Sequence, residues 1–400
     1  MAAGRRSDRV LLTVCDSFGV GAAPDGASYG DEGSNTLGHV ASAVGGLNAP
    51  NLAALGLGAL TDVAGVPADR ARPGTAHGRL TERSAGKDTT TGHWEICGIV
   101  LDRPFPTYPN GFPPEVVQAW ERAIGRGVLG NKAASGTEII EELGEEHLRT
   151  GRPILYTSAD SVFQVATHVR VVPLEQLYDW CRQARRILDG EHRVGRVIAR
   201  PFDGAPGSFF RRPERRDFSV PPPGPTVLDF VQKAGVPVYG VGKIGDIFVG
   251  QGLTEFRYSD SNDHGVDLSI DYLSQGGPCL VMTNLVDFDS KYGHRNDAEG
   301  YARCVEAFDA RLPELVEAVG EGLLLITGDH GCDPTDVTST DHTREFTPAL
   351  VSGVRGVRAG QPVDLGARPV FGDLGATVAE ALGVATEGLA GESFADGIGW

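Results

Sequence analysis

The chain has no pair of cysteines at the C-x-x-C spacing, and its six cysteines are scattered along 400 residues. This distribution is typical of reduced thiols and disfavours a disulfide framework. No apolar run approaches the roughly 20 residues that cross a membrane. The run at 10–14, after the basic N-terminal residues, is too short for the core of a signal peptide. We therefore expect a cytoplasmic protein with no membrane partner.

Positive charge is also scarce, since 36 Lys and Arg stand against 53 Asp and Glu, which gives a net charge of −17. A protein that binds nucleic-acid backbones needs basic surface, so we expect no nucleic-acid partner. An acidic protein that handles an anionic substrate must supply cations locally, as bound metals or a few arginines. No G-x-G-x-x-G run opens a helix after the first apolar segment, so a dinucleotide-binding fingerprint is not supported.

The length of 400 residues predicts about two domains. Short apolar runs at 10–15, 236–241, 279–285 and 323–326 alternate with helical segments, which predicts parallel strands joined by right-handed crossovers. Proline-rich stretches near 104–114 and 221–225 enclose a region with its own helices and strands. We expect an α/β core with a mostly parallel sheet flanked by helices, built from residues 1–101 and 223–400. An α+β domain, residues 102–222, is inserted into it.

Acidic and imidazole side chains follow three of the expected strands. In open α/β sheets, ligands bind beyond the carboxyl ends of the strands. Each of these residues alone could be a turn, a helix cap or a packed loop residue. Six of them at matching positions favour a two-metal site, in which ions about 3.5–4 Å apart clamp a transferring phosphoryl group. The candidates are Asp16, Asp289, His294, Asp329, His330 and His342.

A second polar segment, GKDTTTGHWE at 86–95, places three threonines between an aspartate and a Gly-His pair. One interpretation is a β-edge followed by a polar loop, with threonines favoured for their strand propensity. The functional interpretation is a nucleophilic hydroxyl that metal coordination activates, without an adjacent base. Thr90 leaves a competing hydroxyl beside Thr89.

The chain resembles the phosphopentomutase family, within the alkaline phosphatase superfamily. The matching segments are DSFGVG at 16–21, GKDTTTGHWE at 86–95, NKAASGT at 131–137, YTSADS at 156–161, RVIARPF at 196–202, NLVDFD at 284–289 and residues 329–342. The resemblance spans nearly the whole chain. It implies an isomerase that interconverts (deoxy)ribose 1-phosphate and 5-phosphate through a phosphothreonine and a 1,5-bisphosphate. It also implies two Mn²⁺ ions and a sugar bisphosphate as activator.

The resemblance also implies roles for individual residues. Thr89 matches the phosphorylated nucleophile and shares one manganese site with Asp16, Asp329 and His330, while Asp289, His294 and His342 match the other site. The inserted domain matches the family's cap, which holds the sugar. The expected substrate contacts are Asp160, Arg196, Ile198, Lys243 and Arg211, with Arg212 as the alternative to Arg211.

Several assignments stay open at this point. Cys332 stands where the family more usually has Asn, and a packed thiol is favoured over a metal-binding thiolate. Asp287 shares a strand side with Asp289 by alternation, and Asp289 is preferred because the family motif pairs it with the later histidine. Lys87, His39 and His93 are each either site residues or ordinary loop residues.

Three other functions compete with the mutase. The first two are a two-metal phosphatase and another phosphomutase on the same fold. The third is a non-catalytic, metal-dependent binder of sugar phosphates. The segments YTSADS and RVIARPF argue against the phosphatase, and the complete ligand set argues against the binder.

Overall fold

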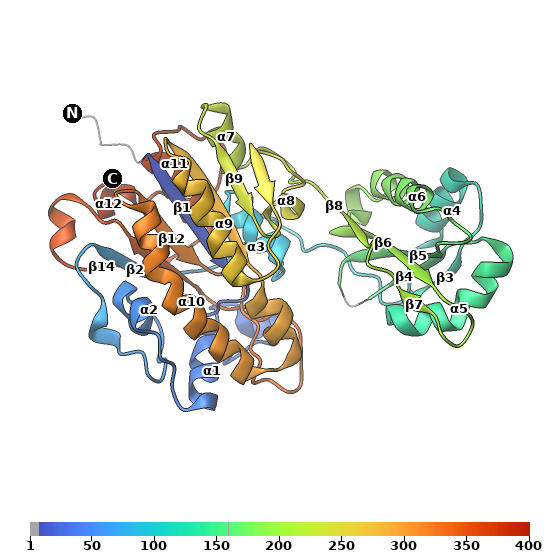
Figure 1. Cartoon of the computed structure of the whole chain (residues 1–400), viewed down its shortest axis with the longest axis horizontal. Helices are drawn as coiled ribbons and strands as arrows, with labels where there is room; N and C mark the ends of the chain where they lie inside the picture. The colour runs from blue at the N-terminus through green and yellow to red at the C-terminus, as the bar shows by residue number, and fades with distance from the viewer. Residues whose placement is uncertain (1–7, 159) are drawn as a thin grey trace. The chain divides into compact units, whose positions relative to one another are not determined.

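The computed structural model describes residues 8–158 and 160–400. The basic N-terminal residues up to Arg6 and Ser7, and Ala159 of the YTSADS segment, lie outside the described residues. The chain forms two compact units (Figure 1): the first comprises the residues up to Arg103 together with Pro222–Trp400, and the second is Pro104–Pro221. The boundaries expected from the sequence lie one or two residues from these.

An eight-stranded sheet forms the centre of the first unit, in the order β10-β9-β11-β1-β12-β13-β2-β14. The strands are β1 (Arg9–Cys15), β2 (Thr75–Leu80), β9 (Val238–Val241), β10 (Glu255–Arg257), β11 (Cys279–Leu285), β12 (Leu323–Thr327), β13 (Thr347–Ser352) and β14 (Val363–Arg368). Neighbouring strands are parallel except at β13, which runs antiparallel to both β12 and β2. The mostly parallel sheet predicted from the sequence is therefore confirmed.

The central strands are buried on both faces, which explains their continuous apolar sequences. On one face, Leu11, Val281 and Leu324 join a core beneath the helices that include α9 and α10. Strand alternation turns the intervening side chains to the other face, where Cys97 Sγ after α3 lies 3.8 Å from Met282 Sδ. The helices are α1 (Thr36–Val44), α2 (Pro50–Leu55), α3 (Thr89–Ile96), α7 (Val227–Lys233), α8 (Ile244–Ile247), α9 (Asn262–Ser274), α10 (Ala298–Val319), α11 (Gly372–Ala381) and α12 (Ala395–Ile398). Among the described residues, none of the helices has the length and apolar character that crossing a membrane requires.

Three adjacent strands of this sheet end at the same level. In the register, Cys15 of β1 lies opposite Leu285 of β11, and Val14 lies opposite Thr327 of β12. Because β11, β1 and β12 are parallel neighbours, the chain leaves the sheet three times at one edge. The acidic segments that follow these strands begin within a few residues of this edge.

The second unit contains a six-stranded sheet in the order β3-β4-β5-β6-β7, with β8 paired to β6. Its strands are β3 (Leu129–Ala133), β4 (Ile154–Thr157), β5 (Val162–His168), β6 (Arg196–Asp203), β7 (Phe210–Arg211) and β8 (Arg216–Ser219). One core packs α4 (Pro114–Ile124) and α6 (Leu174–Ile187) on residues such as Val197. A second core, with Phe202, packs α5 (Gly136–Thr150) on the other side. Alternation along β6 places Arg196, Ile198 and Arg200 on the same face of the sheet as Phe202.

Candidate metal centre

Asp16 directly follows β1, and its carboxylate is fully buried. Its Oδ2 accepts a hydrogen bond from Asn284 Nδ2 at 3.2 Å and lies 3.5 Å from Lys243 Nζ. Its Oδ1 has no hydrogen-bond partner among the described residues. Burial raises the pKa of Asp16, but Lys243 and His330 outweigh that effect and hold the pKa well below its usual range. The side chain is thus a buried, ionised carboxylate with one open oxygen.

Asp329 and His330 follow β12 and are buried. The backbone N–H of Ser17, a residue with a φ of 72°, donates to Asp329 Oδ1 at 3.1 Å. His330 Nδ1 lies 3.0 Å from the carbonyl oxygen of Gly331. Since a carbonyl can only accept, Nδ1 carries the proton in the neutral ring and Nε2 presents a lone pair.

His330 Nε2 faces three oxygen atoms. Asp16 Oδ1 and Asp329 Oδ2 each lie 3.4 Å from this nitrogen, and Thr89 Oγ1 lies 3.2 Å from it. The three oxygens come from the end of β1, the end of β12 and the start of α3. The structure therefore brings together the four residues predicted for the first metal site.

Thr89 is the first residue of α3, and Asp88 is the N-cap. The Asp88 carboxylate accepts from the backbone N–H groups of Thr90 and Thr91 at 3.1 and 3.2 Å, and from the Thr91 hydroxyl at 2.6 Å. The alternative prediction of a β-edge is wrong here, because Asp88 satisfies the free N–H groups of a helix start. Of the three hydroxyls, only that of Thr89 is within hydrogen-bonding distance of His330 in the described structure.

A second group forms around Asp289, which lies in the short π-helix Phe288–Tyr292 after β11. Asp289 Oδ2 is 3.2 Å from His294 Nε2, and Asp289 Oδ1 is 3.7 Å from His342 Nε2. The two Nε2 atoms are 3.2 Å apart. His294 Nδ1 lies 2.6 Å from the carbonyl oxygen of Thr340, so this ring also turns its Nε2 toward the Asp289 carboxylate.

The side chains present fit divalent cations. Asp289, His294 and His342 form one potential ligand group and Asp16, Asp289 and His330 another, with the ligand atoms in each group within 4.8 Å of one another. Asp16 Oδ1, Asp289 Oδ1 and Asp329 Oδ2 are buried without hydrogen-bond partners among the described residues. Such unpaired oxygens are costly unless a cation or proton compensates them. Carboxylate oxygen and imidazole nitrogen are ligands that Mn²⁺ and Zn²⁺ accept.

The pKa values describe the same cluster in terms of charge. Asp289, followed by Cys332, raises the pKa of His294 to about 11. Burial lowers the pKa of His330, but Asp329 and Asp16 reverse this and hold it well above its usual range. Burial and the neighbouring rings of His330 and His294 hold the pKa of His342 well below its usual range. Without a metal, protons on two imidazoles therefore balance the carboxylates, and bound metal ions would replace those protons.

Two buried ionisable residues that the sequence reasoning did not single out connect the site's loops. Arg344 donates from Nη1 to Glu82 Oε2 and to the Gly86 carbonyl, both at 2.6 Å, and from Nη2 to Asp25 Oδ2 at 2.9 Å. Glu345 accepts from Thr36 Oγ1 at 2.6 Å and from Thr343 Oγ1 at 2.7 Å. The available signal was the charged pair Arg344-Glu345, which begins two residues after His342. These contacts fix the His342 loop against the segment that leads into α3.

We expect Arg344→Met to destabilise the first unit by about 3–5 kcal/mol, because it leaves the Glu82 carboxyl buried without its partner. Burial raises the pKa of Glu82 well above its usual range, and Arg344 acts against this rise. Chemical denaturation measures the change in the free energy of unfolding. The double variant Glu82→Gln/Arg344→Met should recover part of the loss, and no recovery would contradict the assigned pairing.

The structure shows the contacts of Asp287 and Lys87, whose roles the sequence left open. Asp287 Oδ2 accepts from the backbone N–H of Asn262 at 3.0 Å and lies 3.1 Å from Lys291 Nζ. Strand alternation does not extend to Asp287, because β11 ends at Leu285 and the chain turns. Lys87 Nζ lies 3.0 Å from Asp31 and 3.6 Å from Asp341, so it joins loops beside the site.

The structure also shows the surroundings of His39, Cys332 and His93, whose roles the sequence left open. His39 Nδ1 lies 2.5 Å from Asp333 Oδ2 in the loop after His330. Cys332 is buried, and burial raises the pKa of its thiol. His93 is fully buried beside Asp329. Ser17 and Asn284 contact the carboxylates of Asp329 and Asp16, respectively. Both residues lie in segments that resemble the family, but the sequence did not indicate a role for either.

The substrate contacts expected in the second unit lie on and beside β6. Arg196 is 3.6 Å from both Asp160 and Asp217, and Ile198 is buried. Arg211 on β7 is exposed and makes no ion pair with a described residue. Arg212 instead lies 3.6 Å from Asp203 and donates from Nε to Glu214 at 3.0 Å. Of these two arginines, Arg212 is the one that ion pairs hold in place.

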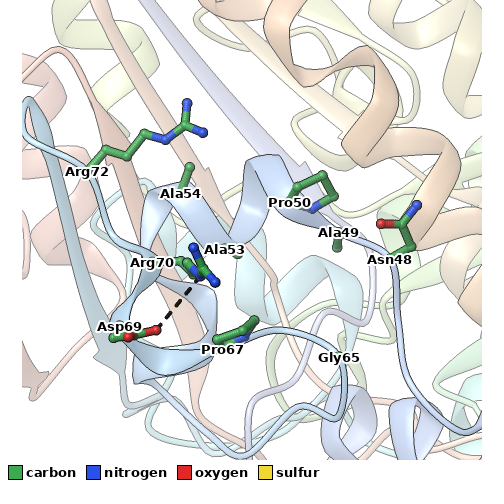
Figure 2. Close-up of a pocket in the computed structure, with 10 residues that line it drawn as sticks. All are labelled: Asn48, Ala49, Pro50, Ala53, Ala54, Gly65, Pro67, Asp69, Arg70 and Arg72. Carbon is green, nitrogen blue, oxygen red and sulfur yellow. Dashed lines mark ion pairs between the residues drawn. The ribbon is translucent and has the colours of Figure 1, made fainter.

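A separate pocket of about 450 Å³ lies in the first unit, beside α2 (Figure 2). Its lining includes Arg70 and Arg72, and Arg70 is 3.9 Å from Asp69. None of the predicted site residues lines it. Its walls also hold no grouped histidines or carboxylates of the kind found around His330.

Comparison with known proteins gives matches over nearly the whole chain. The Metalloenzyme superfamily profile matches residues 8–386. Proteins described as phosphopentomutase are similar throughout. One from Caldanaerobacter subterraneus subsp. tengcongensis is 54% identical, covering 94% of each chain. One from Carboxydothermus hydrogenoformans is 54% identical, covering 96% of this chain and 98% of the relative. One from Anaeromyxobacter dehalogenans is 57% identical over 97% of each.

Proposed function

The chain belongs to the phosphopentomutase family of the Metalloenzyme superfamily and is an isomerase, and we propose that it interconverts (deoxy)ribose 1-phosphate and (deoxy)ribose 5-phosphate through phospho-Thr89. The observation that carries this proposal is the placement of Thr89 Oγ1 at 3.2 Å from His330 Nε2, within the cluster of open carboxylate oxygens. No other threonine hydroxyl of the 89–91 triplet has that environment among the described residues.

The proposed reaction conserves the phosphoryl group. The bond between phosphorus and Thr89 Oγ1 breaks, and phosphorus bonds to the free hydroxyl of the sugar phosphate, whose proton is released. This gives a 1,5-bisphosphate. In the return step, the other phosphate moves to Thr89 Oγ1, and the sugar oxygen that it leaves takes up a proton. A sugar bisphosphate would also phosphorylate enzyme that lacks the phosphate on Thr89, which accounts for its proposed role as activator.

The proposed ligands would hold two Mn²⁺ ions. Asp16, Asp329, His330 and Thr89 belong to one site, and Asp289, His294 and His342 to the other, with Asp289 close enough to contribute to both. When bound, such ions neutralise a transferring phosphoryl group and lower the pKa of a coordinated hydroxyl. Asn284 and Ser17 keep the carboxylates of Asp16 and Asp329 in place. The N-terminus of α3 favours negative charge on Thr89.

We also propose that Asp160, Arg196, Ile198, Arg211 and Lys243 contact the substrate. Lys243 supports this through its position 3.5 Å from Asp16 with a partly exposed side chain. Arg196 and Arg211 supply positive charge in the second unit, which an acidic chain needs for an anionic substrate. The six cysteines are free and buried, which supports the proposed cytoplasmic location.

The decisive test follows ribose 5-phosphate with Mn²⁺ and a catalytic amount of sugar bisphosphate by phosphorus NMR. We expect ribose 1-phosphate to form until the two isomers reach equilibrium, with little inorganic phosphate. Sustained release of inorganic phosphate without the isomer would support the phosphatase. Binding without turnover would support the non-catalytic binder.

Arg211→Gln should raise KM for the sugar phosphate roughly 10- to 100-fold, because a hydrogen bond to a charged group contributes about 1.5–3 kcal/mol. The matched control is Arg212→Gln, since Arg212 is already paired with Glu214 and Asp203. Its KM should stay near the original value. Steady-state kinetics at saturating metal compares the two variants, and a larger effect at Arg212 would reverse the assignment.

A further inference from the structure

His93 lies one helical turn beyond Thr89 on α3 and is completely buried. Its Nδ1 is 2.8 Å from the carbonyl oxygen of Thr89. The same nitrogen is 3.1 Å from Asp329 Oδ2. One imidazole atom thus contacts both the residue that carries the proposed nucleophile and a proposed metal ligand.

The hydrogen bond identifies which nitrogen carries the proton. Because the Thr89 carbonyl only accepts, Nδ1 is the donor, and in the neutral ring Nε2 is unprotonated. His93 Nε2 is buried and has no hydrogen-bond partner among the described residues, and neither has Asp329 Oδ2. The Nδ1–H is therefore directed at Thr89, while Asp329 Oδ2 packs beside it and keeps its lone pairs available.

The backbone around His93 makes this close approach possible. A Cβ on Gly92 would lie 2.2 Å from the carbonyl oxygen of Asp329, so only glycine lets α3 pack this tightly on the segment after β12. On the other side, the backbone N–H of Ser17 holds Asp329 Oδ1 at 3.1 Å. The Asp329 carboxylate is thus confined between Ser17 and the His93 ring.

We propose that His93 is a positioning residue that sets the first turn of α3 against Asp329. Its Nδ1–H fixes the backbone of Thr89, and its ring limits the position of the Asp329 carboxylate, whose free oxygen would bind a metal ion. Partners that orient metal ligands commonly change metal affinity 10- to 100-fold when they are removed. The inference rests on the proposed function for the role of Thr89, but its effect on metal binding does not require turnover.

The test compares two amides that reproduce different nitrogens of the ring. The amide nitrogen of His93→Asn reaches the position of Nδ1, whereas that of His93→Gln reaches toward Nε2. Mn²⁺ affinity is measured by calorimetry on metal-free protein, and phosphate on Thr89 by intact mass after incubation with a sugar bisphosphate. We expect Asn to stay within about threefold of the original Mn²⁺ affinity, and Gln and Ala to lose about 10- to 100-fold. Where isomerisation is measurable, kcat should fall more than KM.

Circular dichroism of the metal-free variants separates folding from positioning. Equal metal affinity and equal Thr89 phosphorylation in folded Asn, Gln and Ala variants would overturn the inference, as would a folded Asn variant that binds Mn²⁺ tenfold more weakly. Failure of the Asn variant to fold also counts against it, because the amide supplies the same hydrogen bond. If the original protein binds Mn²⁺ but forms no isomer, the proposed function fails while the calorimetric comparison still decides the role of His93.

Discussion

Thr89→Ala is expected to abolish isomerisation, with a fall in kcat on the order of 10⁶-fold, the scale seen when an enzyme loses its covalent nucleophile. The variant keeps the Asp88 cap, because Asp88 accepts from Thr90 and Thr91 and not from Thr89. The fold should therefore survive. After incubation with Mn²⁺ and a sugar bisphosphate, intact mass should show one added phosphate on the original protein and none on the variant.

Thr90→Ala is the matched control for the nucleophile. The Thr90 hydroxyl has no hydrogen-bond partner among the described residues, and its backbone N–H, which the cap uses, is unchanged. We expect this variant to isomerise and to accept phosphate near the original level. Peptide mapping that found the phosphate on residue 90, or isomerisation that survived in Thr89→Ala, would remove Thr89 from the mechanism.

Asp289→Asn should have the second large effect, because Asp289 belongs to both potential ligand groups. The amide removes a negative charge that raises the pKa of His294 and places N–H donors where lone pairs face the cluster. We expect bound manganese to fall from two ions per chain to one or fewer, and kcat to fall by about 10³-fold or more. Metal analysis of gel-filtered protein and steady-state kinetics give the two readouts.

Asp287→Asn controls for the loss of charge two residues away. The Asp287 carboxylate contacts Asn262 and Lys291 and belongs to neither ligand group. This variant should keep its manganese and its activity, with at most a modest loss of stability. If both substitutions removed metal equally, the assignment of Asp289 as the shared ligand would be wrong.

The closeness of the strand ends could be predicted because it depends on local patterns. Apolar runs long enough for buried strands, separated by helical segments, predict parallel neighbours whose carboxyl ends meet at one edge. Asp16, Asp289, Asp329 and His330 each follow such a run within a few residues. Their assembly therefore follows from sequence pattern together with one topological rule.

Other features of the site depend on which of several similar polar side chains forms a given hydrogen bond in the folded chain. The sequence could not show that Asp88 caps a helix and so leaves Thr89 facing His330, because a run of threonines also suits a strand. Asp287 and Asp289 look equivalent until the chain leaves β11 and turns one carboxylate away.

By itself, the sequence determined the kinds of group available, their family and the sheet edge where they meet, because apolar periodicity and strand order are encoded locally. Only the tertiary structure decided which oxygens stay unpaired, which ring nitrogen faces the cluster and how His93 lies between Thr89 and Asp329. The contacts of Thr89 with His330 and of His93 with Asp329 join segments more than 200 positions apart, whose geometry is fixed only when the whole sheet has formed.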